Sequence, residues 1–180
     1  MDRRTAPSAS PALARVARGD LCSGCGACAA IAAGKVVMEM QPPGYLRPRQ
    51  TAPLSDRQEA EITAACPGLR QHVKADGRAD SVLWGPYLEM FTGLATDPAL
   101  RHTASSGGAL SAILTHLLDS GMVDKIITTG ADPQQPTGNT AVLADDARTI
   151  QQAAGSRYAP SSPLAALPAY LDEYRTIGTR

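Results

Sequence analysis

A chain of 180 residues can bury a hydrophobic core, either as one compact domain or as a small domain joined to a larger one. Its 17 lysines and arginines balance its 17 aspartates and glutamates, so no net charge favours nucleic acid or an anionic membrane as a partner. No apolar run approaches the about 20 residues that cross a bilayer. The charged opening MDRRTAPSAS also lacks the apolar core of a secretory signal. We therefore expect a soluble, cytoplasmic protein without a membrane span.

The opening of the chain predicts a polar tail followed by a short helix. Residues 1–8 are polar, and we expect them to be disordered. Ser10 followed by Pro11 is typical of a helix start, and Gly19 is typical of a helix end. The predicted helix leads directly into a run of cysteines.

A hairpin and a second helix are predicted after that run. Residues 35–40 (KVVMEM) predict a strand, and residues 44–49 (GYLRPR) predict its hairpin partner across a Pro-Pro-Gly turn. Ser55 with Gln58 three residues later predicts a capping box, and thus a helix that leads to Cys66.

From about residue 83 onward, the pattern changes to alternating strands and helices, which is typical of an α/β layer. The apolar side chains after the ASSGG sequence recur at three- and four-residue steps, as in a helix that faces a core. We expect strands at 87–94, 123–129 and 140–144, of which the strand at 123–129 should be buried and parallel. We also expect helices at 104–121, 147–153 and 163–174. Pro168 is a candidate for a break in the last of these helices.

Cysteine spacing is the most informative feature of the sequence. Three of the four cysteines, Cys22, Cys25 and Cys28, stand at even three-residue spacing in LCSGCGACA, and Cys66 is the remaining one. Such a run lets each thiolate reach a different corner of an iron–sulfur cube, and Cys66 is the candidate for the fourth corner. The glycines between the first three cysteines allow the backbone to approach the cluster closely. The spacing predicts one [4Fe-4S] cluster and a redox function.

Other readings of the cysteines remain open. Zinc is an alternative, although its ligands usually come as two separated Cys-x-x-Cys pairs. A disulfide framework would need an oxidising compartment, which the opening sequence does not indicate. A two-cluster ferredoxin would add a cysteine followed by proline at positions 32 and 33, where this chain has two alanines.

A second candidate site lies at the predicted start of the longest helix. Ser105, Ser106, Gly107 and Gly108 could offer free amides, hydroxyls and the positive end of a helix dipole to a phosphate or a nucleotide-like cofactor. Equally, these residues could have structural roles alone, in which the serines cap the helix and the glycines allow close packing. A second segment, Ser156, Arg157 and Tyr158, offers a guanidinium group for phosphate and a ring for stacking. The three histidines, His72, His102 and His116, lack the partner pattern of catalytic groups.

Six sequence blocks together resemble one known family. In chain order they are CSGCGAC, GYLRP, CPG, WGPY, ASSGGALSAILTHLLDSGMVD and GSRYAPSSPL. From about Leu21 to Leu167 the chain resembles the N-terminal portion of the coenzyme F420 hydrogenase/dehydrogenase beta-subunit family. That family includes the flavoprotein subunits of F420-reducing hydrogenases and reductases that act on the 7-hydroxymethyl group of chlorophyll.

The resemblance implies an iron–sulfur flavoprotein with two redox centres. It implies a [4Fe-4S] cluster on Cys22, Cys25, Cys28 and Cys66, and FAD against residues 105–108 with residues 156–158 nearby. The partner implied is a redox protein or an organic hydride carrier such as coenzyme F420, and an oligomer or an association with other subunits is possible. Family members continue beyond the block at 170–178 with a Gly-x-Pro-Cys segment and a C-terminal domain, so we expect this chain to be the N-terminal half of such a protein.

Together these features predict an α+β or α/β fold, with a small ferredoxin-like module followed by an α/β layer with a mixed sheet. The expected division is a tail and short helix at 1–19, an iron–sulfur module at 20–80 and a flavin-binding portion at 81–180. The leading hypothesis is an iron–sulfur flavoprotein oxidoreductase, and we do not expect independent catalysis by this chain. The alternatives are an electron-transfer module without a working flavin site and a zinc-stabilised interaction domain.

Overall fold

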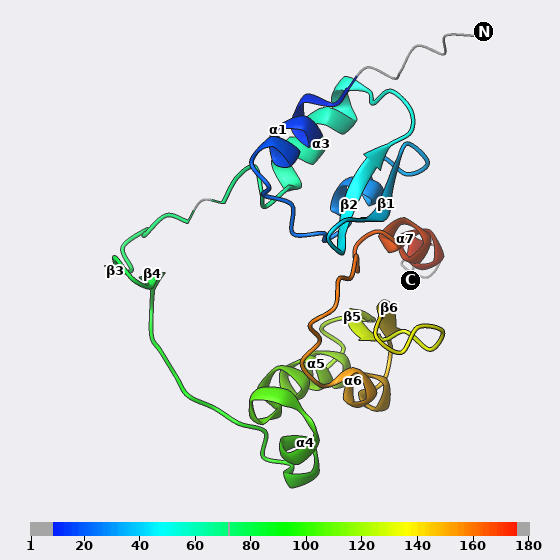
Figure 1. Cartoon of the computed structure of the whole chain (residues 1–180). Helices are drawn as coiled ribbons and strands as arrows, with labels where there is room; N and C mark the ends of the chain where they lie inside the picture. The colour runs from blue at the N-terminus through cyan, green and yellow to red at the C-terminus, as the bar shows by residue number, and fades with distance from the viewer. Residues whose placement is uncertain (1–8, 72, 176–180) are drawn as a thin grey trace, which may run out of the picture.

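The computed structural model describes residues 9–71 and 73–175 (Figure 1). The expectations for residues 1–8 and for His72 lie outside the described residues. The elements in chain order are α1 (Pro11–Arg18), α2 (Ala27–Ile31), β1 (Val36–Gln41), β2 (Tyr45–Gln50), α3 (Asp56–Ala65), β3 (Ala79–Ser81), β4 (Gly85–Tyr87), α4 (Pro98–Thr103), the 3₁₀ helix η1 (Ser105–Gly108), α5 (Ala109–Asp119), β5 (Ile126–Ala131), β6 (Asn139–Ala144), α6 (Ala147–Ala153) and α7 (Leu167–Arg175).

The chain has an α+β fold, one of the two predicted classes, but the described residues do not form the predicted mixed sheet. In the described part of the chain, the strands form three separate two-stranded antiparallel sheets, β1–β2, β3–β4 and β5–β6. No helix within residues 9–71 and 73–175 combines the length and the apolar character that crossing a bilayer requires.

The N-terminal elements pack around a small apolar core. Its buried members are Ala12, Ala29, Ala32, Val36 and Ile62, which come from α1, from α2 and the turn after it, from β1 and from α3. Apolar side chains recur on the inner face of each short helix, so helices of only a few turns are stabilised by packing rather than by their own length. This core holds the elements on either side of the cysteine loop.

Helices α1 and α3 are also joined by a buried polar contact. Ser10 is the N-cap of α1, and its hydroxyl accepts the Leu13 N–H at 3.1 Å. The same hydroxyl donates to Glu59 of α3, with distances of 2.9 and 2.7 Å to the two carboxylate oxygens. Glu59 Oε1 further accepts the Ala12 N–H at 2.6 Å. One carboxylate thus satisfies groups at the start of α1 that have no partner inside the helix.

The predicted hairpin and the predicted capping box are both confirmed. Strands β1 and β2 pair in antiparallel register from Val36 opposite Gln50 to Gln41 opposite Tyr45. Ser55 and Gln58 form the reciprocal capping box at the start of α3, and Cys66 is the residue at which that helix ends.

A second group of elements, α4 to α6 with β5 and β6, packs separately from the first. Ala144 and Ile150 are fully or almost fully buried where α6 covers the β5–β6 hairpin. Between the two groups, the described residues form the short β3–β4 hairpin and an extended segment, which Figure 1 shows as a long green connection. After α6 the chain returns to the N-terminal group, where α7 lies near α2.

Two strand predictions need correction. Residues 88–94 are not a strand: β4 ends at Tyr87, and the apolar side chains that follow are exposed and have no neighbouring strand to pair with. The predicted strand at 123–129 is present as β5, but it pairs antiparallel with β6. The connection between them is short, and a parallel pairing would need a longer crossover.

Three helix predictions also need correction. The helix expected from residue 104 begins at Ala109, because Ser106, Gly107 and Gly108 adopt left-handed φ values of 52°, 66° and 74°. The helix expected at 163–174 begins only at Leu167, since residues 163–166 form a turn, and Pro168 lies in the first turn of α7, where its missing N–H costs nothing. Helix α4 was not predicted.

The cysteine-lined cavity and its neighbours

Two helix ends and one loop bring the cysteines together. Cys22 and Cys25 lie in the loop between α1 and α2, and Cys28 lies in the first turn of α2. Cys66 ends α3, where its N–H donates to the Ile62 carbonyl at 2.9 Å. The packing of α2 against α3 therefore joins three cysteines that are close in sequence with one that is remote.

All four cysteines line one cavity. Its other lining side chains are mainly apolar and include Leu13, Val16, Ile31, Met38 and Ile62. Each cysteine is partly buried and carries a free thiol. Among the described residues, no three His, Cys, Asp or Glu side chains converge closely enough to hold a single metal ion. The four thiols are nevertheless lining residues of one shared cavity, and sulfur donors of this kind bind iron or zinc as thiolates.

The electrostatic surroundings of Cys28 reflect this gathering. Burial is the largest cause that raises the pKa of the Cys28 thiol to about 11, and the neighbouring Cys22, Cys25 and, to a smaller extent, Cys66 contribute to the same rise. A thiol with this pKa is protonated at neutral pH. Binding of a metal or cluster to Cys28 would therefore release its proton, because the thiolate is the ligand.

Glycines permit the close approach of the segments that carry the cysteines. Gly24 and Gly26 adopt left-handed φ values of 76° and 86° within the loop. A Cβ atom at Gly68 would lie 2.5 Å from the Leu21 carbonyl oxygen, so the segment after Cys66 touches the backbone just before Cys22. A side chain at Gly68 would push the remote cysteine away from the other three.

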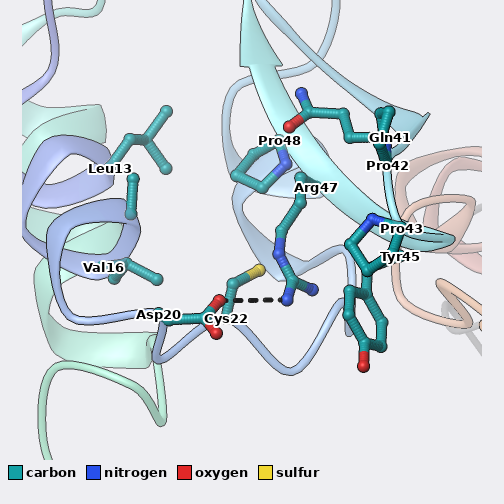
Figure 2. Close-up of a pocket in the computed structure, with 11 residues that line it drawn as sticks. Leu13, Val16, Asp20, Cys22, Gln41, Pro42, Pro43, Tyr45, Arg47 and Pro48 are labelled. Carbon is teal, nitrogen blue, oxygen red and sulfur yellow. Dashed lines mark hydrogen bonds and ion pairs between the residues drawn. The ribbon is translucent and has the colours of Figure 1, made fainter.

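A second cavity of about 310 Å³ adjoins the first and shares Cys22 with it (Figure 2). Arg47 of β2 reaches into this cavity, where its Nη2 lies 3.3 Å from Asp20 Oδ1. Its guanidinium carbon lies 4.7 Å from the centre of the Tyr45 ring, and Nη1 donates to the Leu46 carbonyl at 3.3 Å. These contacts fix a positive charge on the Cys22 side of the thiol cluster.

The two segments of the other predicted site meet at one point. The Ser156 hydroxyl donates to the Ser105 hydroxyl at 2.9 Å, although the two residues are 51 positions apart. Ser105 and Arg157 line a common cavity of about 400 Å³ together with Ser111, which sequence reasoning missed.

The remaining residues of that predicted site lie outside the cavity. Ser106 is exposed, Gly107 is half-buried and Gly108 is buried against Leu100 and Ala95. Tyr158 is 94% exposed, so its ring has no contact that covers it in the described chain. His102 and His116 are exposed on α4 and α5.

Sequence reasoning also missed Asp20, Tyr45 and Arg47 beside Cys22. The last two lie within the GYLRP block, so that block carried a signal for them. It further missed residues 161–165, which lie against the cysteine loop. No pattern in the sequence indicates that contact.

Four thiols around one cavity are the donor set of iron–sulfur and zinc proteins. Residues 90–168 match the family model described as coenzyme F420 hydrogenase/dehydrogenase, beta subunit N-term. The resemblance predicted from the sequence blocks is thereby confirmed for the segment, which lies after all four cysteines.

Among solved structures, the chain is similar to one from the xenon-derivatised F420-reducing [NiFe] hydrogenase complex of Methanosarcina barkeri, with 27% sequence identity and a TM-score of 0.41. The match covers 47% of this chain and 28% of that one, so this chain corresponds to less than a third of the hydrogenase chain. A search of curated proteins gave no match.

Proposed function

We propose that this chain is the part of an iron–sulfur flavoprotein oxidoreductase that holds a [4Fe-4S] cluster and one side of an FAD site. The observation that carries the proposal is that Cys22, Cys25, Cys28 and Cys66 all line one cavity. A cube offers a separate iron to each thiolate, whereas zinc needs all four at about 2.3 Å from one centre.

The family match supports the redox assignment. It covers the segment that contains Ser105 and Ser156, whose hydroxyls are hydrogen-bonded, and Arg157, which lines the same cavity as Ser105. Hydroxyl groups and a guanidinium group are suitable partners for the phosphates of a dinucleotide. We propose that FAD binds there, with residues 105–108 and 156–158 against it.

A flavin and a cubane cluster have complementary roles when both are bound, because a flavin exchanges one or two electrons and a cluster exchanges one. This chain would contribute the four thiolates, the apolar walls around them and the phosphate-binding side chains. By relation to the family, the proposed partner is an organic hydride carrier of the F420 type or a redox protein. We also propose that the chain assembles with other subunits and is located in the cytoplasm.

The cluster is tested by anaerobic reconstitution of the full chain with iron and sulfide. We expect about four irons and four sulfides per chain, with a broad visible absorbance that bleaches on reduction. One bound zinc in a colourless protein would instead indicate a zinc-stabilised interaction domain. A protein that binds neither metal would overturn the assignment of the cysteines.

The flavin is tested separately by the fluorescence released when the purified protein is denatured. We expect Arg157→Ala to lower flavin content several-fold and to leave iron content unchanged, with the exposed Arg148→Ala as the matched control. Replacement of Gly107 by valine should also abolish flavin retention, because a Cβ there would lie 3.1 Å from Leu94 Cβ and the φ of 66° disfavours a side chain.

A second candidate is an electron-transfer module that binds the cluster without a flavin. The observation in its favour is the exposure of Arg157 and Tyr158, which the described chain leaves uncovered. Iron and sulfide without released flavin, in protein purified and reconstituted with FAD present, would support this module over the flavoprotein.

A further inference from the structure

The segment of residues 161–165, which we call the strap, leaves the second group of elements and lies against the cysteine loop. In Figure 1 it is the orange chain that runs between α6 and α7. The Ser162 hydroxyl donates to the Gly24 carbonyl at 2.7 Å, across 138 positions of sequence. The Leu164 N–H donates to the Cys25 carbonyl at 3.0 Å. Two consecutive carbonyls of the cysteine loop are therefore held by the strap.

The strap also packs closely against the next residue of the loop. A Cβ atom at Gly26 would lie 2.7 Å from the backbone nitrogen of Ala165 and 2.9 Å from its Cβ. No larger residue fits at Gly26 while the strap stays in place. Three successive residues of the loop, Gly24, Cys25 and Gly26, thus contact the strap.

The two hydrogen bonds fix the direction of two amides as well as two carbonyls. In a trans peptide the N–H points opposite to the carbonyl of the preceding residue. The peptides that follow Gly24 and Cys25 are trans, since the one cis bond among the described residues is Pro42–Pro43. With both carbonyls turned toward the strap, the N–H groups of Cys25 and Gly26 are turned away from it.

The loop, and not the strap, lines the cysteine-lined cavity. Cys25 and Gly26 are among its lining residues, and no residue of the strap is. An N–H group of the loop that is turned away from the strap can therefore face the cavity. Neither amide donates to a backbone carbonyl within the described chain, so both N–H groups are available as donors.

We propose that Ser162 is a positioning residue that, through the strap, aims the Cys25 and Gly26 amides at the sulfur atoms of the bound cluster. The inference rests on the proposed cluster function. Amide hydrogen bonds to sulfur stabilise the extra negative charge of the reduced cluster and so raise its reduction potential. They also stabilise the bound thiolates, which slows loss of iron. The segment matched to the redox family thus sets the potential of a cluster whose ligands lie outside that segment.

The experiment compares four variants of the full chain after anaerobic reconstitution. Ser162→Val removes the hydroxyl, and Ser162→Thr has nearly the same volume as valine but keeps it. Ser162→Ala removes the hydroxyl without added bulk. Ser161→Ala is the matched control, because no hydrogen bond of the Ser161 side chain is present in the described chain. The readouts are the reduction potential by anaerobic titration and the rate of iron loss to a chelator.

We expect Ser162→Ala and Ser162→Val to shift the potential to more negative values and to speed iron loss by about two- to tenfold, as for one lost hydrogen bond. Ser162→Thr and Ser161→Ala should keep both values near those of the unchanged chain. Equal potentials in all four variants would overturn the role of Ser162 while the cluster assignment stands. An unchanged chain that takes up no iron–sulfur cluster would overturn the cluster assignment itself, and with it this inference.

Discussion

Substitution of Gly26 by alanine tests whether the strap closes on the cysteine loop. The added Cβ would meet the Ala165 nitrogen at 2.7 Å, and the φ of 86° is disfavoured for any residue with a side chain. A left-handed conformation costs an L-residue about 1–2 kcal/mol. Overpacking against backbone costs about 1–3 kcal/mol more. We therefore expect Gly26→Ala to lower the free energy of unfolding by about 2–5 kcal/mol, a large fraction of the 5–15 kcal/mol typical of a whole protein.

Gly34→Ala is the matched control for the backbone term. Gly34 also has a left-handed φ, 77°, but nothing lies within 4 Å of a Cβ placed there. Gly34→Ala should therefore lower the free energy of unfolding only by the cost of the left-handed conformation, about 1–2 kcal/mol. The difference between the two variants isolates the contact with the strap.

The assay is urea unfolding followed by circular dichroism, together with hydrogen exchange at the Leu164 amide. That amide is protected by its bond to the Cys25 carbonyl, and a displaced strap would expose it. If the strap detaches instead of straining the loop, the stability loss is limited to the free energy with which the strap docks, and exchange at Leu164 becomes fast. Equal stability losses in both variants, with Leu164 still protected in Gly26→Ala, would refute the close packing of strap and loop.

Three further predictions concern the surroundings of the cysteines. Glu59→Gln should destabilise the chain by about 1–3 kcal/mol in urea unfolding, because it removes a charged acceptor from a buried serine hydroxyl and an amide at the start of α1. Glu61→Gln, which loses only an exposed i,i+4 ion pair, should cost less than about 0.5 kcal/mol, and equal losses would contradict the bridging role. Arg47→Leu should make the reduction potential of a reconstituted cluster more negative than Arg49→Leu does. Both substitutions remove one positive charge, but only Arg47 lies beside Cys22. The same shift of the potential in both variants would contradict a local effect of Arg47. Cys66→Ser should lower iron below about four per chain on reconstitution, and an unchanged iron content would exclude Cys66 as a ligand.

Local signals in the sequence predicted the N-terminal elements well. Ser10 before Pro11, and Ser55 with Gln58, act on backbone groups within three residues, so their effect is visible without tertiary contacts. Helix α4 carried a similar signal, since Asp97 caps it and Pro98 begins it. That signal was missed because the segment before it was interpreted as a strand.

The errors occurred where a structure depends on a partner elsewhere in the chain. Residues 88–94 are apolar enough for a strand, but a strand forms only where another lies beside it. Residues 104–108 contain two serines and two glycines. The helical periodicity after this segment did not indicate that Ser106 to Gly108 adopt left-handed backbone conformations before the helix begins. For β5 and β6, the short connection was a better guide to the antiparallel pairing than the apolar composition.

By itself, the sequence determined which thiols are candidates for a donor set. The number and spacing of the cysteines, the glycines between them and the caps that end the helices at the right residues are all local properties of the chain. Only the tertiary structure decided that Cys66 shares a cavity with the other three, that Arg47 places its charge beside Cys22, and that Ser162 holds the cysteine loop. Each of these depends on packing between segments that are far apart in sequence, and no local pattern encodes where such segments meet.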